Sequence, residues 1–256
     1  MKTVENTMKA AVTLLPPQSK RLIARAVKEL PQVENALQEG IVVIASGSTN
    51  GYVAEEILNK EIDRKRYLTG ATLPPGVTRD EAGIGQDIPD VVLRQGQLAP
   101  DLDRLSALKE MNEGDVYIKG ANALNYEEQV AGVLIGGHGG AGTIGGAWGH
   151  VIGRRLHLVI PVGLEKCVAQ DINEVAHAVN SGGDHYTPDT PRLMPVRGTI
   201  ITEIEAFAIL TGVYAYHLAS GGIYGAEGAV WLLLEGDNEQ VEAALDLVNE
   251  LKETSG

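Results

Sequence analysis

The chain has 256 residues, which is enough for one large domain, or for one α/β domain with a small appendage. Its formal net charge is −13 and its 21 Lys and Arg residues are scattered, which argues against a nucleic-acid partner, because binding to phosphate backbones needs clustered cations. The one cysteine, Cys167, excludes an intrachain disulfide and a cysteine-based zinc site.

The N-terminal region predicts two helices, a buried strand and a third helix. Apolar residues recur on one helical face of residues 19–39, where Pro31 starts a second helix and Gly40 ends it. Residues 41–46 form a continuous apolar, β-branched run, as in a strand that is buried on both faces of a parallel sheet. An amphipathic helix follows from about residue 53.

The middle of the chain alternates between predicted strands and helices. Residues 72–89 form a loop rich in Pro and Gly, which is either a mobile lid or a wrapped surface loop. Repeated alternation of strand and helix predicts an α/β fold, with a mostly parallel sheet and helices on both faces. The elements expected here are strands at residues 67–69, 91–93, 116–118, 133–135 and 156–161, a helix capped by Asp101, and a helix at residues 169–179.

Residues 181–195 are rich in Gly, Pro, Asp and Thr, which is typical of a connector. Residues 1–180 are therefore predicted to be an α/β ligand-binding domain, and residues 196–256 a small C-terminal α+β subdomain or an extension of the main sheet. The elements expected in the second part are a strand at residues 199–201, a helix at 203–217, a strand at 229–234 and a last helix capped by Asp237, with Gln240 three residues later.

Gly47, Ser48, Thr49 and Asn50 lie between the first predicted strand and the helix that follows it. The first N-H groups of a helix have no partner within the helix, so such a turn binds phosphate or carboxylate well. The alternative is that Ser48 or Thr49 only caps the helix.

A second segment, residues 136–149, has eight glycines among its fourteen residues. Its sequence from Gly137 to Gly142 fits the dinucleotide-binding pattern G-x-G-x-x-G, but no acidic residue ends the next predicted strand to hold a ribose. We therefore favour close backbone packing or a pocket for a ligand that is not a nucleotide.

Three residues are candidates for an acid-base group: His138 in the glycine segment, Lys166 after the strand at residues 156–161, and Glu128. Each has a plain alternative, namely a surface histidine, a solvated lysine and a solvated glutamate. No histidine pairs with another histidine or a cysteine at metal-ligand spacing, so we expect no metal site and no cofactor.

Taken together, residues 19–180 resemble the superfamily of ribose-5-phosphate isomerases, glucosamine-6-phosphate deaminases, DeoR-type sugar sensors, methylthioribose-1-phosphate isomerases and CoA transferases. The turn that begins at Gly47 is similar to the phosphate loop of that superfamily, and residues 115–122 (DVYIKGAN) to its strand Asp-x-x-x-Asp-Gly-Ala-Asp. In the isomerases, two carboxylates of that strand act on the sugar. Here Lys119 and Asn122 stand in their place, so isomerisation of that kind is not expected.

The sequence thus predicts a protein that binds a small phosphorylated or carboxylated metabolite, either as an enzyme of unassigned reaction or as a non-catalytic sensor. A nucleotide-dependent oxidoreductase is the third alternative. The protein is expected in the cytoplasm and without a membrane partner, because no apolar run is long enough to span a bilayer and no convincing signal peptide is seen. A homo-oligomer is possible. The predicted ligand-binding residues are Gly47, Ser48, Thr49, Asn50, Asn122, Gly137, Gly139, Gly140 and Lys166.

Overall fold

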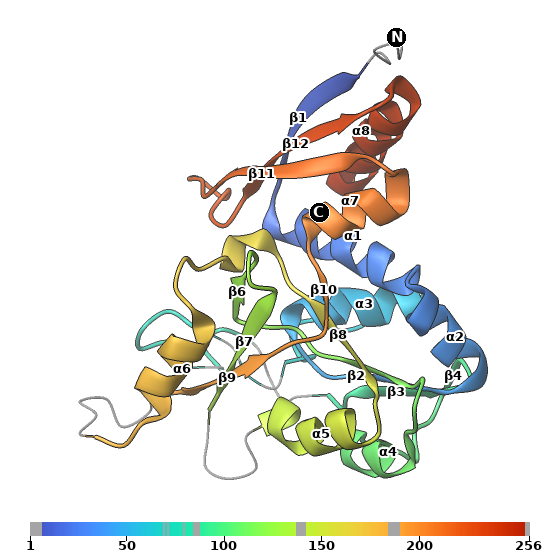
Figure 1. The fold of residues 1–256 in the computed structure, drawn as a ribbon, viewed down its shortest axis with the longest axis vertical. Helices are drawn as coiled ribbons and strands as arrows, with labels where there is room; N and C mark the ends of the chain where they lie inside the picture. Colours follow the sequence, from blue (N-terminus) through green and yellow to red (C-terminus); the bar gives the residue numbers. More distant parts are fainter. Residues whose placement is uncertain are drawn as a thin grey trace.

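A six-stranded sheet forms the centre of the fold, with the strand order β10-β8-β5-β2-β3-β4 (Figure 1). The structure is a computed structural model that describes residues 7–68, 70, 72–78, 80–83, 88–136, 142–183 and 190–253. Strands β10, β8, β5 and β2 pair in parallel, whereas β3 pairs antiparallel with both β2 and β4. The predicted α/β class is therefore confirmed. The strands are β2 (Ile41–Ile44), β3 (Val91–Arg94), β4 (Gln97–Leu98), β5 (Val116–Ile118), β8 (His157–Pro161) and β10 (Thr199–Ile201).

Helices cover both faces of this sheet because alternate side chains of its strands point to opposite sides. Val42 and Ile44 of β2 are buried in one apolar cluster together with side chains of α1, α2 and α3, whereas Val43 is buried in a second cluster with side chains of α4 and α5. The helices are α1 (Pro16–Lys28), α2 (Pro31–Glu39), α3 (Ser48–Leu58), α4 (Arg104–Glu110) and α5 (Gly142–Gly153).

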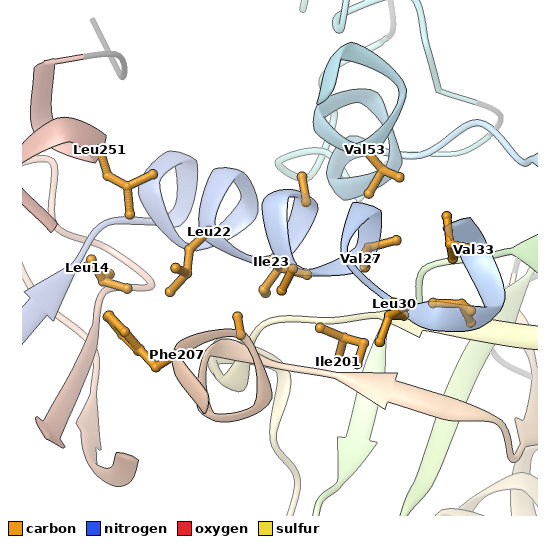
Figure 2. Packing of buried hydrophobic residues seen from close by; sticks show 14 of the residues in the cluster. Leu14, Leu22, Ile23, Val27, Leu30, Val33, Val53, Ile201, Phe207 and Leu251 are labelled. Atoms are coloured by element: carbon orange, nitrogen blue, oxygen red, sulfur yellow. The ribbon is translucent and has the colours of Figure 1, made fainter. Parts of the chain in front are cut away.

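Helix α1 joins the central sheet to a second, three-stranded sheet. Figure 2 shows Leu22, Ile23 and Val27 of α1 between side chains from several elements, with Phe207 and Ile201 on one side. All three α1 side chains are fully buried, so this helix is the packing centre of the larger cluster. The second sheet has the order β1-β12-β11 and is made of β1 (Met8–Leu14), β11 (Tyr214–Ser220) and β12 (Val230–Gly236), with α7 (Glu203–Thr211) and α8 (Asn238–Glu253) packed beside it.

Both sheets combine strands from residues 1–180 with strands from residues 196–256, the two parts into which the sequence prediction divides the chain. Strand β1, near the N-terminus, pairs antiparallel with β12, while β10 extends the central sheet by pairing with β8. Strand β1 is not predicted from the sequence, because its partner lies more than two hundred residues away in sequence and pairing over such a distance leaves no local signal.

A third sheet, of order β6-β7-β9, corrects two expectations. Its strands are antiparallel, so the strand predicted at residues 133–135 does not belong to the parallel sheet. Strand β9 also occupies part of the predicted connector at residues 181–195, where Asn180 binds the backbone of Leu193. The elements are β6 (Ala123–Asn125), β7 (Val130–Ile135), the 3-10 turn η1 (Leu164–Lys166), α6 (Ile172–Asn180) and β9 (Arg192–Val196).

Three further expectations are corrected. The helix predicted at residues 203–217 ends at Thr211, because Gly212 adopts a left-handed conformation with φ of 76°, and residues 214–220 become a strand. Asp103, and not Asp101, caps α4. Tyr67 is not in a strand; its side chain is buried, and its hydroxyl accepts a hydrogen bond from the Val91 N-H.

The predicted cap of α8 is confirmed. The side chains of Asp237 and Gln240 each accept a hydrogen bond from the other residue's backbone N-H at the start of this helix.

None of the helices within the described ranges combines the length and the apolar composition needed to cross a bilayer.

Candidate functional site

A pocket of about 420 Å³ lies where β2 and β5 end and where α3 and α5 begin. Ligand sites of open α/β sheets form at this edge, because loops leave the carboxyl ends of parallel strands there and helices start. The described residues that line the pocket are Ser46, Gly47, Ser48, Thr49, Asn50, Gly70, Thr72, Lys119, Gly120, Ala121, Asn122, Val133, Leu134, Ile135, Gly136, Gly142, Thr143, Ile144, Lys166 and Pro191.

The turn before α3 forms one wall of the pocket. The N-cap residue of α3 is Gly47, and no side chain caps the helix, so the alternative in which Ser48 or Thr49 caps it is wrong. The first backbone bond of the helix runs from the Gly51 N-H to the Gly47 carbonyl. A helix leaves its first N-H groups without helical partners and carries a partial positive charge at this end, so this wall of the pocket is electropositive.

Asn50 fixes the position of this wall. Its side chain is fully buried, and Nδ2 donates to the carbonyl oxygens of Ala45 at 2.6 Å and Ile118 at 3.1 Å. The amide therefore ties the first turn of α3 to the ends of β2 and β5. The other side-chain atom, Oδ1, is buried without a hydrogen-bond partner among the described residues.

An ion pair below the turn holds the end of β2. Arg104 of α4 donates to Oδ2 of Asp90, and Oδ1 of Asp90 accepts from the Ser46 N-H at 2.6 Å. Only 5% of the Asp90 side chain is exposed, so this carboxylate is a structural support of the pocket floor.

Two lysines, Lys119 and Lys166, line the pocket. Lys119 follows β5 and donates to the Gly120 carbonyl at 3.2 Å, and Lys166 in η1 donates to the Ala121 carbonyl at 3.0 Å. Burial, and after it the positive charge of Lys166, lower the pKa of Lys119 to about 8, although Asp90 acts in the opposite direction.

Helix α5 contributes a second helix N-terminus. Its first residues, Gly142, Thr143 and Ile144, line the pocket, and the Tyr117 hydroxyl of β5 fixes this turn by donating to the Thr143 carbonyl at 3.0 Å. No Asp or Glu lines the pocket within the described part of the chain. Two helix N-termini and two lysines thus give a positive pocket on a chain whose net charge is −13.

The structure brings most of the predicted ligand-binding residues together. Gly47, Ser48, Thr49 and Asn50 line one pocket with Asn122 and Lys166, although the Asn122 Oδ1 atom already accepts from the Leu134 N-H. Gly137, His138, Gly139 and Gly140 lie outside the described residues. Glu128 is exposed in the turn between β6 and β7, where it does not line the pocket.

Lys119 and Thr143 also line the pocket but are not among the ligand-binding residues predicted from the sequence. In the sequence, Lys119 stands only as the replacement of a carboxylate. The available signal was its place directly after a buried strand of the parallel sheet, where a side chain reaches the ligand-binding edge. Thr143 gave no signal of its own.

The glycine segment does not have the structural context of a dinucleotide fingerprint. That fingerprint needs a strand, a helix and a second strand that is parallel to the first in the same sheet. Here β7 belongs to the small antiparallel sheet, whereas β8, which follows α5, belongs to the central sheet.

No protein-family model, curated protein or solved structure matches the chain at a significant level. The chemistry of the pocket therefore has to be inferred from the side chains and backbone groups that line it. The resemblance to the sugar-phosphate isomerase and CoA-transferase superfamily remains a prediction from sequence.

Proposed function

We propose that this protein binds a small phosphorylated or carboxylated metabolite in the pocket between α3, α5 and the two lysines. One observation carries the proposal: two helix N-termini and two lysine side chains line the same pocket, and no acidic side chain lines it within the described ranges. Backbone N-H groups at helix starts and a lysine ammonium are the usual partners of phosphate and carboxylate.

The ligand is a compact hydroxylated anion of the sugar-phosphate kind. A pocket of about 420 Å³ is in the range of small-molecule sites. Ser48 and Thr49 line the pocket, and their hydroxyl groups form hydrogen bonds with ligand hydroxyls, while Val133, Ile135 and Ile144 provide an apolar wall for a carbon skeleton. This combination favours a phosphorylated polyol or sugar over an inorganic anion alone.

Binding is better supported than carboxylate-catalysed isomerisation. Lys119 and Lys166 are the ionisable side chains of the described pocket lining, and the carboxylate of Glu128 lies outside it, in the turn between β6 and β7. Membership of the sugar-phosphate isomerase and CoA-transferase superfamily is part of the proposal; its support is that the pocket forms at the turn beginning at Gly47 and at residues 115–122, the two segments that carry the resemblance.

Calorimetric titration with ribose 5-phosphate and with ribose tests the proposal. We expect the phosphate ester to bind and ribose not to bind measurably. Lys166→Met should weaken binding of the ester by about ten-fold, because a charge-assisted hydrogen bond contributes about 1.5 kcal/mol or more. Lys60→Met removes the same charge at an exposed position outside the pocket lining and should change affinity less than about two-fold. Equal weakening by both variants, or equal binding of ribose and its phosphate, would contradict the proposal.

A further inference from the structure

The setting of the Lys119 amine differs from that of Lys166, the other lysine of the pocket. Lys119 is partly buried at the end of β5, and its amine donates to the adjacent Gly120 carbonyl at 3.2 Å. Among the described residues, no acidic side chain forms a salt bridge with it, in contrast to Lys166, whose ammonium lies 4.0 Å from Glu165. The amine is therefore not held in its charged form by a close carboxylate.

We propose that Lys119 is a nucleophilic lysine that forms an imine with an aldehyde or ketone bound in this pocket. The proposal rests on the function proposed above, because the anionic group of the carbonyl compound would be held by the start of α3 and by Lys166. The preferred ligand class is thus a phosphorylated hydroxyaldehyde or hydroxyketone.

The charges around Lys119 favour its neutral, nucleophilic form. Lys166 in η1 and Arg104 in α4 disfavour the ammonium, and Asp90, the only acidic group that influences it among the described residues, already pairs with Arg104. The first turn of α3 and that of α5 add partial positive charge to the same pocket. Desolvation next to another cationic group is an established way to activate a lysine for imine formation, and the pKa of about 8 agrees with it.

The chemical step needs no further reactant. The lone pair of the neutral Lys119 nitrogen attacks the carbonyl carbon, and one proton passes from that nitrogen to the carbonyl oxygen to give a carbinolamine. The hydroxyl group then leaves as water after it receives a proton from the Lys166 ammonium, the other charged side chain in the described pocket lining, and the nitrogen returns its remaining proton to Lys166. The product is an imine between the lysine nitrogen and the former carbonyl carbon.

Reductive trapping tests the proposal. The protein is incubated near pH 7 with glyceraldehyde 3-phosphate and sodium cyanoborohydride, whose hydride converts the imine into a stable secondary amine, and the modified lysines are identified by peptide mass spectrometry. We expect Lys119 to be labelled at least about ten-fold faster than the exposed Lys60, because a lower pKa gives a larger neutral fraction.

Lys119→Arg keeps a positive charge but cannot form the imine, so the fast label should be lost, whereas Lys60→Arg should keep it. If Lys119→Arg fails to fold, as judged by circular dichroism, the peptide map of the unchanged protein decides alone. Equal labelling of Lys119 and Lys60, or fast labelling at Lys166 in place of Lys119, would overturn the proposal.

The failure of this inference can be told apart from failure of the proposed function. Ribose 5-phosphate binding without fast labelling of Lys119 would overturn the imine and leave the anion site standing. Equally fast labelling of Lys119 by glyceraldehyde and by its phosphate, without ribose 5-phosphate binding, would support the reactive lysine and contradict the anion site.

Discussion

The side chain of Asn50 donates a hydrogen bond to the backbone carbonyl of Ile118 at 3.1 Å, one residue before Lys119. A second bond from the same amide, to the Ala45 carbonyl, is 2.6 Å long. One buried side chain thus holds the start of α3, the end of β2 and the end of β5 together. The position of the turn at Gly47 to Asn50 relative to Lys119 depends on this contact.

Replacing Asn50 by Ala should therefore destabilise the protein. The substitution removes the Asn50 donor from the Ala45 carbonyl, whereas the Ile118 carbonyl still accepts from the Ala45 N-H at 3.0 Å. A buried carbonyl that loses its donor costs about 1 to 3 kcal/mol, and we expect the free energy of unfolding, measured with urea, to fall by about that amount. Asn249→Ala, at an exposed position of α8, is the control and should change it by less than about 0.5 kcal/mol. A loss no larger than that of the control would show that the amide is not a support of the pocket.

The ion pair between Arg104 and Asp90 should matter more than a similar pair at the surface. Arg104→Met leaves the nearly buried Asp90 carboxylate unpaired, which we expect to cost about 3 kcal/mol. Arg94→Met breaks the exposed pair with Glu110, which we expect to contribute less than about 1 kcal/mol. Urea unfolding of both variants measures the difference, and similar losses would contradict it.

Sulfate binding should weaken as the pH rises through about 8, because the pKa of Lys119 lies there and its charge is lost above it. Sulfate keeps its own charge over this range, so the change reports on the protein. Lys166, Arg104 and Asp90 are the charged groups that influence Lys119. Imine trapping needs the neutral amine and should accelerate over the same interval. Sulfate affinity that stays constant from about pH 7 to about pH 9 would rule out this titration.

Because of Glu203, we expect the free energy of unfolding to fall as the pH rises. Its carboxylate is fully buried and accepts from the Leu164 N-H at 2.9 Å, below the turn that carries Lys166. Burial raises its pKa from 4.5 to about 7. The folded state therefore holds this proton more tightly than the unfolded chain, and the resulting stability is present at acidic pH and is lost as the pH rises through about 7.

Glu203→Gln should remove that decline. A shift of this size corresponds to roughly 3 kcal/mol between about pH 5 and about pH 8, so the difference in unfolding free energy between Glu203→Gln and the unchanged protein should grow in favour of the variant over this range. Glu242→Gln, at an exposed position of α8, should show no such trend. A pH-independent difference for Glu203→Gln would mean that the carboxyl group does not titrate in this range.

Local patterns in the sequence were enough to predict the turn at Gly47 to Asn50 as a wall of the site. A buried strand followed at once by a helix places its turn at the ligand-binding edge of a parallel sheet, whatever the order of the other strands. The cap of α8 by Asp237 is local in the same sense, because its partner Gln240 is three residues away.

The other features depend on contacts that are distant in sequence. The pairing of β1 with β12 joins the two ends of the chain, and the sequence near residues 8–14 contains no local signal that predicts it. The apolar run that became β7 looks the same in a parallel and in an antiparallel sheet, so its assignment was decided by tertiary pairing with β9. The sequence does not single out Lys119 as a pocket residue. Lys166, which lines the same pocket, lies forty-seven positions later, and nothing local links the two.

Chemical-shift mapping of the backbone amides during titration with sulfate tests the anion site most directly. We expect the largest shifts at Ser48, Thr49 and Asn50, at residues 119–122, and at Thr143, with saturation at one common affinity. Shifts confined to exposed lysines elsewhere, or changes without saturation, would contradict the site.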